Sequence, residues 1–402
     1  MRSLLALVSV VAVGAGAFVV APTANAASPA GQEWTQQTTP VSGDWQAVTY
    51  GDGRFVAVAN SGTANQIVTS TNGVDWTAHS VTTGWPDVYW RSVVHGNGTF
   101  VAVGATGTGR VASSTDGSTW TLRTAAEANE WMSVTYGAGV FVAVSKGGTH
   151  RIMTSPDGTS WTAVTAPQAN EWTAVTYAAG LFVAVAQSGT DRVMTSTDGT
   201  NWTPRTAASA SNWAALTYGN GTFVATAWDG VDRVMTSSNG TTWTARTAPS
   251  ASQWLSVTYG DGLFVAVSLD AAGDRVMTSP DGVTWTTTPA ASQQRWVGIA
   301  YGGDRFVAVA NFAGLSGVMM SEAVVDPVLD ASQWTIVSQA LPMPASRDCA
   351  DVVDADYAWG TGLTGGWKRG WESWEASDPG VGGGWACTRS LVNTGGNTWR
   401  LG

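Results

Sequence analysis

The chain has 402 residues and a formal net charge of −10, and only 12% of its residues are charged, against about a quarter in an average globular protein. The acidic balance and the lack of any Lys/Arg cluster remove the positive surface that nucleic acids and anionic membranes require, so we exclude both as partners. Gly, Thr, Ser, Ala and Trp are abundant, which is typical of a turn-rich β protein.

The N-terminal segment has the pattern of a secretory signal peptide. Arg2 precedes an uninterrupted small and apolar run from Leu4 to Ala21, and Ala24-Asn25-Ala26 provides a cleavage site. We therefore predict a signal peptide over residues 1–26 with cleavage after Ala26. No later segment reaches the roughly 18 to 20 apolar residues of a membrane helix, so we expect a secreted protein without membrane insertion.

A repeat of about 41 residues occupies most of the chain and is marked by a regularly recurring tryptophan. The spacings between successive copies are 45, 41, 41, 41, 41 and 42 residues. Such a period indicates a stacked-repeat or propeller architecture. The seven marker residues are Trp45, Trp90, Trp131, Trp172, Trp213, Trp254 and Trp296.

Each copy divides into four short strands separated by glycine-rich turns. In the third copy they are "MSVTY", "VFVAV", "RIMTS" and "SWT". The second strand, "FVAV" in six copies, is apolar on both faces, as expected where a sheet is packed between two neighbouring sheets. Four strands per copy and seven copies predict an all-β fold, a seven-bladed β-propeller.

The turn before each fourth strand carries a second motif, such as "SPDGTSW" or "STDGSTW". We interpret its Asp or Asn as a local turn staple, because such side chains accept backbone N–H groups within their own turn. The motif resembles the Asp-box of the BNR-like propellers, which include sialidases and photosystem assembly factor propellers, although it is one residue shorter here. The resemblance covers residues 34 to about 321 and implies the propeller fold.

Two segments could complete the last blade, because the seventh copy has only three strands. Trp34-Thr35 stands 11 residues before Trp45, as Trp120-Thr121 stands 11 before Trp131. We expect the N-terminal strand to close the ring, with Trp334-Thr335 as the rival. The predicted organisation is a propeller over residues 27–325, a linker over 326–334 and a tryptophan-rich domain over 335–402.

Catalytic and cofactor signals are weak. The resemblance to sialidases implies an arginine cluster with an acid and a Tyr/Glu pair, but the arginines here belong to the repeat, so we predict no catalytic residues. The histidines His79, His95 and His150 stand in different blade contexts and indicate no metal site. The G-x-G-x-x-G match at Gly360 follows no strand, so we expect no cofactor.

Departures from the repeat are the better candidates for ligand binding. Glu130 and Glu171 precede their blade tryptophans, where the other copies carry different residues. Large aromatic residues in loops are also costly without a use. The blade-specific candidates are Trp85, Glu130, Lys146, His150, Glu171 and Trp228.

The last 68 residues hold six tryptophans and the chain's two cysteines. Cys349 and Cys387 are predicted to pair, because no further Cys or His suggests a metal site. The tryptophans would form the core of a small domain, stack on sugar rings or make a protein interface. The ligand candidates in this segment are Trp359, Trp367, Trp371 and Trp374.

Two functional hypotheses follow. The first is a secreted, non-catalytic binding or scaffold protein that recognises carbohydrate, cell envelope or a protein partner, and the near identity of the copies favours it. The second is a secreted glycoside hydrolase of sialidase-like design. Enzymatic activity is left open, with the balance against it, because a catalytic site needs several unmatched polar residues converging on one place.

Overall fold

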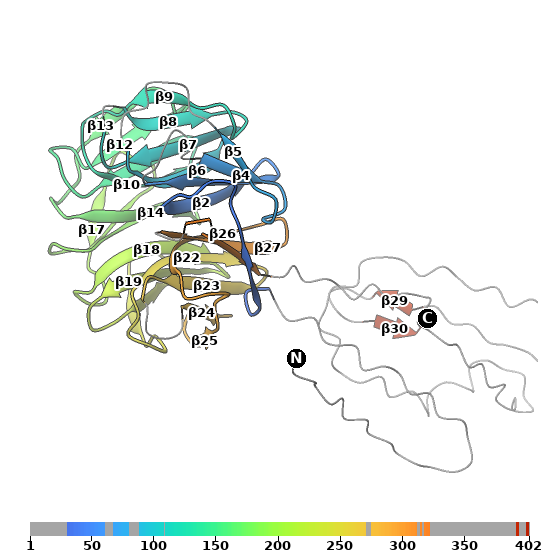
Figure 1. Cartoon of the computed structure of the whole chain (residues 1–402). Helices are drawn as coiled ribbons and strands as arrows, with labels where there is room; N and C mark the ends of the chain where they lie inside the picture. The colour runs from blue at the N-terminus through green and yellow to red at the C-terminus, as the bar shows by residue number, and fades with distance from the viewer. Residues whose placement is uncertain are drawn as a thin grey trace, which may run out of the picture. The chain divides into compact units, whose positions relative to one another are not determined.

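The structure is a computed structural model that describes residues 30–60, 67–79, 88–107, 109–270, 275–311, 314–315 and 317–321, with the backbone of 391–393 and 399–401. Over these residues it contains seven four-stranded antiparallel sheets and one two-stranded sheet, and no helix. The seven sheets are the blades of a propeller (Figure 1). The predicted fold class is therefore confirmed.

The first strand of each blade lies at the inner edge of its sheet, because successive first strands contact one another around the ring and β2 contacts β26. These strands line the central channel. They are β2 (Trp45–Gly51), β6 (Trp90–Gly96), β10 (Trp131–Gly137), β14 (Trp172–Ala178), β18 (Asn212–Gly219), β22 (Trp254–Gly260) and β26 (Arg295–Gly302).

The second and third strands form the middle of each blade and are almost wholly buried. The second strands are β3 (Arg54–Ala59), β7 (Thr99–Gly104), β11 (Val140–Ser145), β15 (Leu181–Ala186), β19 (Thr222–Asp229), β23 (Leu263–Ser268) and β27 (Arg305–Asn311). The third strands are β4 (Ile67–Ser70), β8 (Arg110–Ser114), β12 (Ile152–Ser155), β16 (Val193–Ser196), β20 (Val234–Ser237), β24 (Val276–Ser279) and β28 (Val318–Ser321).

The fourth strands form the outer edges. Six follow their own blade: β5 (Thr77–His79), β9 (Thr121–Thr124), β13 (Thr162–Val164), β17 (Thr203–Arg205), β21 (Thr244–Arg246) and β25 (Thr286–Thr288). The seventh is β1 (Trp34–Gln37), which pairs antiparallel with β28, Trp34 opposite Ser321 and Gln37 opposite Val318. Of the two candidate closing strands, the N-terminal one holds this position, and Trp334 lies outside the described residues.

The blade tryptophans and the apolar second strands make the core. All seven tryptophans have no exposed surface, and each sits beside a β-bulge where the first strand shifts register, as between Trp131 and Ser133. In the third to seventh blades the indole Nε1 donates to a carbonyl four residues upstream, for example from Trp172 to Gln168. In these five blades, burying a large indole with its polar atom satisfied fixes the entry to the blade.

The stapled turn between the third and fourth strands has the same hydrogen bonds in the first six blades. In blade 3, Oδ1 of Asp157 accepts the N–H groups of Thr159 and Ser160 at 2.8 and 3.1 Å. The hydroxyl of Ser155 accepts the N–H of Gly158, whose φ of +74° favours glycine. The predicted structural role of the turn carboxylates agrees with these contacts.

A second unit comprises residues 1–27 and 325–402. The structure describes only two of its strands, β29 (Leu391–Asn393) and β30 (Trp399–Leu401). They pair antiparallel, with Leu391 opposite Leu401. The predicted signal peptide, linker and disulfide cysteines Cys349 and Cys387 lie outside the described residues. Within the described part of the chain, no helix is both long and apolar enough to span a membrane.

Candidate functional site

One end of the channel gathers the positions at which the blades differ most. Each first strand begins there and each second strand ends there, so the residue before the blade tryptophan lies beside the residue that follows the second strand. In blade 3 the N–H of Lys146 donates to the carbonyl of Glu130 at 3.2 Å, and in blade 4 Gln187 does so to Glu171 at 3.0 Å. We call this end the tryptophan-side mouth.

Three sets of residues define the tryptophan-side mouth, in blade order from 1 to 7. Before the tryptophan stand Asp44, Tyr89, Glu130, Glu171, Asn212, Gln253 and Arg295. After it stand Gln46, Arg91, Met132, Thr173, Ala214, Leu255 and Val297. After the second strand, or at its end in blades 5 and 7, stand Asn60, Ala105, Lys146, Gln187, Trp228, Leu269 and Asn311.

Blades 2 to 4 contribute a charged cluster to this mouth, made of Arg91, Glu130, Lys146 and Glu171. Burial lowers the pKa of Lys146, the nearby charge of Arg91 lowers it further, and the carboxylates of Glu171 and Glu130 oppose both. Burial also lowers the pKa of Arg91, and the nearby charge of Glu130 is the main effect that raises it. Side chains from three blades therefore act on one another electrostatically at this place.

The hydrogen bonds of this cluster are few. Nη1 of Arg91 donates to Oε1 of Gln46 in blade 1 at 3.4 Å, and Nε of Arg91 is buried without a partner among the described residues. Oε2 of Glu171 accepts from the side-chain amide of Gln187 at 2.5 Å. No ion pair within 4.0 Å joins the cluster's cations to its carboxylates in the described part of the chain.

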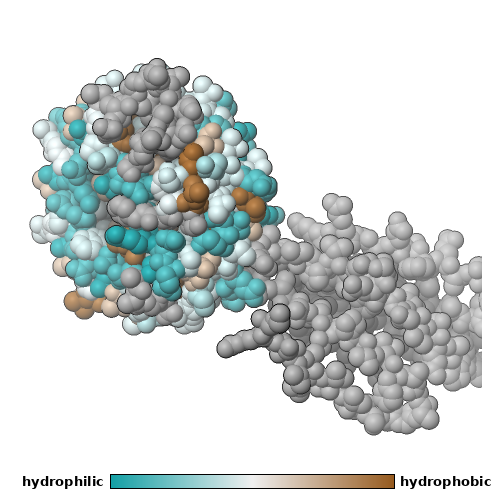
Figure 2. Space-filling view, viewed as in Figure 1, coloured by the Kyte–Doolittle hydropathy of each residue, from teal (hydrophilic) through white to brown (hydrophobic). Residues whose placement is uncertain are grey.

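Blades 5 and 6 give the same mouth an apolar character, through Trp228, Leu255 and Leu269, all half-buried. The sequence analysis expected Trp228 in a loop, but it lies near the end of strand β19 and is half-buried there. Val231, three residues on, is 96% exposed. The face drawn in Figure 2 is mostly hydrophilic, with small separate hydrophobic patches.

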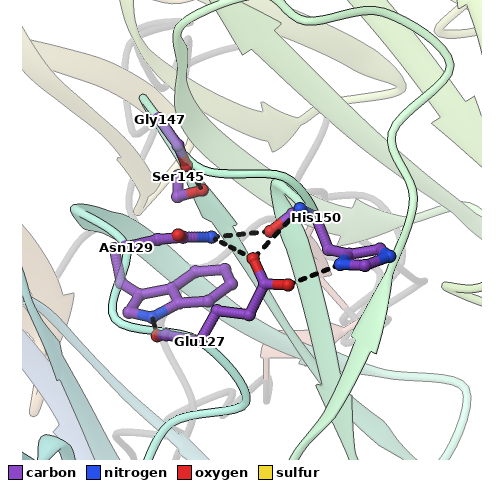
Figure 3. A network of polar contacts seen from close by, with 6 residues as sticks. Glu127, Asn129, Ser145, Gly147 and His150 are labelled. Carbon is purple, nitrogen blue, oxygen red and sulfur yellow. Dashed lines mark hydrogen bonds and ion pairs between the residues drawn. The ribbon is translucent and has the colours of Figure 1, made fainter.

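His150 lies in a different network of blade 3 (Figure 3). Its Nδ1 donates to Oε1 of Glu127 at 2.5 Å, and its backbone N–H donates to Oε2 of the same carboxylate at 3.0 Å. The amide of Asn129 donates to the carbonyl of His150 at 2.6 Å and to Glu127 at 3.2 Å. Burial would raise the pKa of Glu127, but the hydrogen bonds from His150 and Asn129 outweigh it and lower the pKa.

The equivalent loops of blade 4 show that this network fastens two loops together. There the side-chain amide of Gln168 donates to Oδ2 of Asp191 at 2.7 Å, and the N–H of Asp191 donates back to Oε1 of Gln168 at 3.2 Å. Glu127 and His150 occupy the corresponding positions. The contacts of His150 are therefore those of a loop staple rather than of the charged cluster.

The repeated arginines connect neighbouring blades. Nη1 of Arg151 donates to the carbonyls of Lys146 in its own blade and Asn170 in the next, at 2.7 and 2.8 Å. Arg192 makes the same pair of contacts with Gln187 and Ser211. Their guanidinium groups are used for backbone contacts, in keeping with the structural role expected from their repetition.

The opposite end of the channel is formed by the aromatic ends of the first strands. Nε2 of His95, which replaces the repeated tyrosine, lies 3.0 Å from Oδ2 of Asp52 in blade 1. Burial raises the pKa of Asp261, and the neighbouring carboxylate of Asp304 raises it further. Among the described residues, no group of three or more His, Cys, Asp or Glu side chains is arranged to hold a metal ion.

Of the sequence-predicted ligand residues, Glu130, Lys146 and Glu171 lie together in the charged cluster, and Trp228 lies at the same mouth in blade 5. The side chain of His150 is bound to Glu127 instead. Sequence reasoning missed Arg91, which is the only charged residue in the position after the blade tryptophan. The signal that could have found it is this single charge among the uncharged residues of the other copies. The remaining candidates, Trp85, Trp359, Trp367, Trp371 and Trp374, lie outside the described residues.

Comparisons with known proteins agree with the fold. A family model described as the DUF6242 beta propeller domain matches residues 123–253. A search of curated proteins gave no match.

Three solved propellers illustrate the likeness. Virginiamycin B lyase from Staphylococcus aureus is 14% identical, with 72% of this chain and 99% of that chain covered and a TM-score of 0.62. YCF48 from Cyanidioschyzon merolae is 16% identical, with 72% and 98% covered and a TM-score of 0.54. YCF48 bound to D1 peptide is 15% identical, with 73% and 99% covered and a TM-score of 0.55.

The likeness to a lyase and to a peptide-bound protein at such low identity reaches the fold and not the activity. Together with the seven four-stranded sheets, these findings establish the chain as a seven-bladed β-propeller whose third to fifth blades match the DUF6242 beta propeller domain.

Proposed function

We propose that this chain is an exported, non-catalytic binding protein that holds a protein partner at the tryptophan-side mouth. One observation carries the proposal: the charged and aromatic side chains that break the repeat gather at this mouth. Arg91, Lys146 and Glu171 come from three successive blades and influence one another there. Variation concentrated at one place on an otherwise uniform scaffold is the pattern of a site on a rigid support.

The composition of the mouth suits a polypeptide ligand. Charged groups stand in blades 2 to 4, and the apolar side chains of Trp228 and Leu269 stand in blades 5 and 6. A peptide presents both kinds of group along one strand, and interfaces of this kind combine aromatic or apolar anchors with polar contacts around them. That a propeller of similar fold has been captured with D1 peptide supports the idea that this architecture can hold a peptide.

The repeated polar residues fit this reading, since they are used within the fold. The turn carboxylate of Asp157 accepts two backbone N–H groups, and the guanidinium of Arg151 bridges two blades. The proposal therefore places ligand binding in the departures from the repeat. Export rests on the pattern of residues 1–26, and N-terminal sequencing of the exported protein is expected to begin at Ala27.

The test is a peptide selection on the mature chain with a matched variant. Each substitution introduces a residue found at the same mouth position of a sister blade: Arg91→Gln as in Gln46, Lys146→Gln as in Gln187, and Glu130→Gln and Glu171→Gln as in Gln253. Because sister blades carry these residues, the quadruple variant is expected to fold. Peptides selected from a random library on the wild-type chain are expected to bind the variant at least tenfold more weakly.

Three results would overturn the proposal. They are peptides that bind wild type and variant equally, the failure of a diverse library to give any specific peptide, and turnover of a fluorogenic sialoside. A glycan array probed with the wild-type chain and with the quadruple variant tests carbohydrate ligands. If a glycan binds the wild type and not the variant, the ligand of the mouth is a carbohydrate and not a protein.

A further inference from the structure

We infer that Arg91 and Lys146 together form a receptor for a single carboxylate, so that the partner segment bound at the tryptophan-side mouth is acidic. The inference rests on the proposed function and deepens it by naming the chemistry that the mouth selects. Arg91 is held by the inner strand of blade 2, and Lys146 follows the second strand of blade 3. The two cations therefore come from neighbouring blades.

Both cations have unused hydrogen-bonding capacity. A guanidinium has five N–H donors and an ammonium three. The only side-chain hydrogen bond of Arg91 in the described part of the chain is the long contact with Gln46, and its buried Nε has no partner. The ammonium of Lys146 has neither a hydrogen bond nor an ion pair within 4.0 Å among the described residues.

The pair is also partly desolvated, and burial is the main cause that lowers the pKa of both Lys146 and Arg91. Burial and the mutual proximity of Arg91 and Lys146 disfavour the charged ammonium more than Glu171 and Glu130 favour it. A partly desolvated cation without a close counter-ion is stabilised by an incoming anion, because the attraction is stronger there than in bulk water. A carboxylate bound between the two cations would supply acceptors for the ammonium of Lys146 and for the Nη groups of Arg91.

The two glutamates restrict which anion fits. Glu171 is held by the amide of Gln187 at 2.5 Å, and Glu130 is exposed beside Lys146. Both stay within electrostatic range of Lys146, so they repel a ligand that carries several negative charges. A single carboxylate, which arginine can bind through two parallel N–H groups, satisfies the cations with the least repulsion from the glutamates. An acidic side chain in a peptide is such a group.

The experiment compares two peptides that differ only in this group, acetyl-Gly-Glu-Gly-amide and acetyl-Gly-Gln-Gly-amide, titrated into the mature chain. The readouts are the affinity and the NMR signal of the Lys146 side chain, whose pKa should rise when the carboxylate binds. We expect at least a fivefold preference for the Glu peptide. Arg91→Gln and Lys146→Gln should each abolish this preference.

The control is Arg205→Gln, which removes a positive charge from the outer strand β17 while leaving the mouth intact, and it should keep the preference. Equal affinity for the two peptides, a Lys146 signal that does not move, or tighter binding of inorganic phosphate than of the Glu peptide would overturn the inference. Thermal unfolding of each variant checks that it is folded.

The failures of the two proposals can be told apart. Selected library peptides that need the mouth residues but show no enrichment in Asp or Glu would remove only the inference. A clear Glu preference in the short peptides together with an empty library selection would instead leave the carboxylate receptor standing and remove the protein partner.

Discussion

The ring of Tyr50 in blade 1 lies directly over the backbone of Gly302 in blade 7, where a Cβ atom would stand only 2.0 Å from Cγ of the tyrosine. The same contact joins Tyr301 to Gly260 and Tyr136 to Gly96. Each blade thus places the aromatic end of its first strand on the preceding blade, and the contact between Tyr50 and Gly302 completes the circle.

Gly302→Ala is therefore expected to lower the free energy of unfolding by about 1 to 3 kcal/mol, the usual cost of overpacking a tight site. The measurement is equilibrium denaturation of a chain of residues 27–402. Blade 4 offers the matched control, because it carries Ala178 at the equivalent position, so Ala178→Gly should change stability by less. An unchanged unfolding midpoint for Gly302→Ala would show that the rings can move apart freely.

Removing all residues up to 37 should leave the chain with an open sheet edge at β28. Strand β1 supplies four register pairs to this edge, and Nε2 of Gln36 also donates to the carbonyl of Val318 at 2.7 Å. Unpaired edges associate with other chains, so the truncated protein is expected to self-associate in size-exclusion chromatography. A synthetic peptide of residues 28–40 should restore the monomer, and a scrambled peptide should not.

A truncated chain that stays monomeric with an unchanged melting temperature would contradict this expectation. It would mean that another segment can take the place of β1, which is the role that the sequence allowed for Trp334.

The carboxylate turns should make stability depend on pH in the acid range. Although burial favours the neutral acid, hydrogen bonds from Thr119, Ser118 and Ser114 outweigh it and lower the pKa of Asp116 from 3.8 to about 2. A lowered folded-state pKa contributes stability above the unfolded-state pKa, and that contribution is lost as the pH falls from about 4 toward 2. The melting temperature is expected to fall through this window.

Asp116→Asn tests the assignment, because blades 1 and 5 carry Asn72 and Asn239 at the same turn position. The variant should lose less melting temperature than the wild type between pH 5 and pH 2, measured by calorimetry. Parallel curves for the two proteins would mean that other carboxylates cause the acid sensitivity.

The loop staples of blades 3 and 4 should be interchangeable as pairs but not as single residues. His150→Asp alone places a second carboxylate beside Glu127 and should destabilise the fold, whereas Glu127→Gln with His150→Asp recreates the contact between Gln168 and Asp191. Residues in direct contact commonly show coupling energies of about 0.5 to 3 kcal/mol. A double-mutant cycle by chemical denaturation is expected to give a favourable coupling of at least about 1 kcal/mol.

Additive effects of the two substitutions would contradict the staple and reopen a binding role for His150. The single variant Glu127→Gln, which keeps a neutral partner for the histidine, serves as the intermediate of the cycle.

The propeller was predictable because its evidence is repeated seven times along the chain. A spacing of about 41 residues and the apolar "FVAV" strands specify the blades without any knowledge of distant contacts. Ring closure was harder, since two segments carry the same Trp-Thr pair and only the pairing of Trp34 with Ser321 distinguishes them. A Trp-Thr pair predicts a fourth strand, but it does not show which sheet edge that strand pairs with.

The candidate site was only partly predictable. Lys146 stood out as a charge that the other copies lack, and Glu130 as a carboxylate at a position where the copies differ. Arg91 was not singled out, although it is the only charge at its position. The partner of His150 was also hidden: Glu127 lies 23 residues away, and two loops must converge before the contact exists. Residues that depart from the repeat are candidates for a binding site. Their contacts with one another cannot be predicted from the sequence, because they form only when the blades are arranged in the closed ring.

The closing strand also fixes an order of events. The hydroxyl of Thr35 donates to the carbonyl of Met320, 285 residues away. The first strand to be synthesised can therefore pair only after the last strand of the propeller has been made. Bringing such distant segments together is entropically costly and slow compared with forming each local hairpin. The pairing of β1 with β28 therefore depends on both ends of the propeller, and we expect it to form after the local hairpins of the blades.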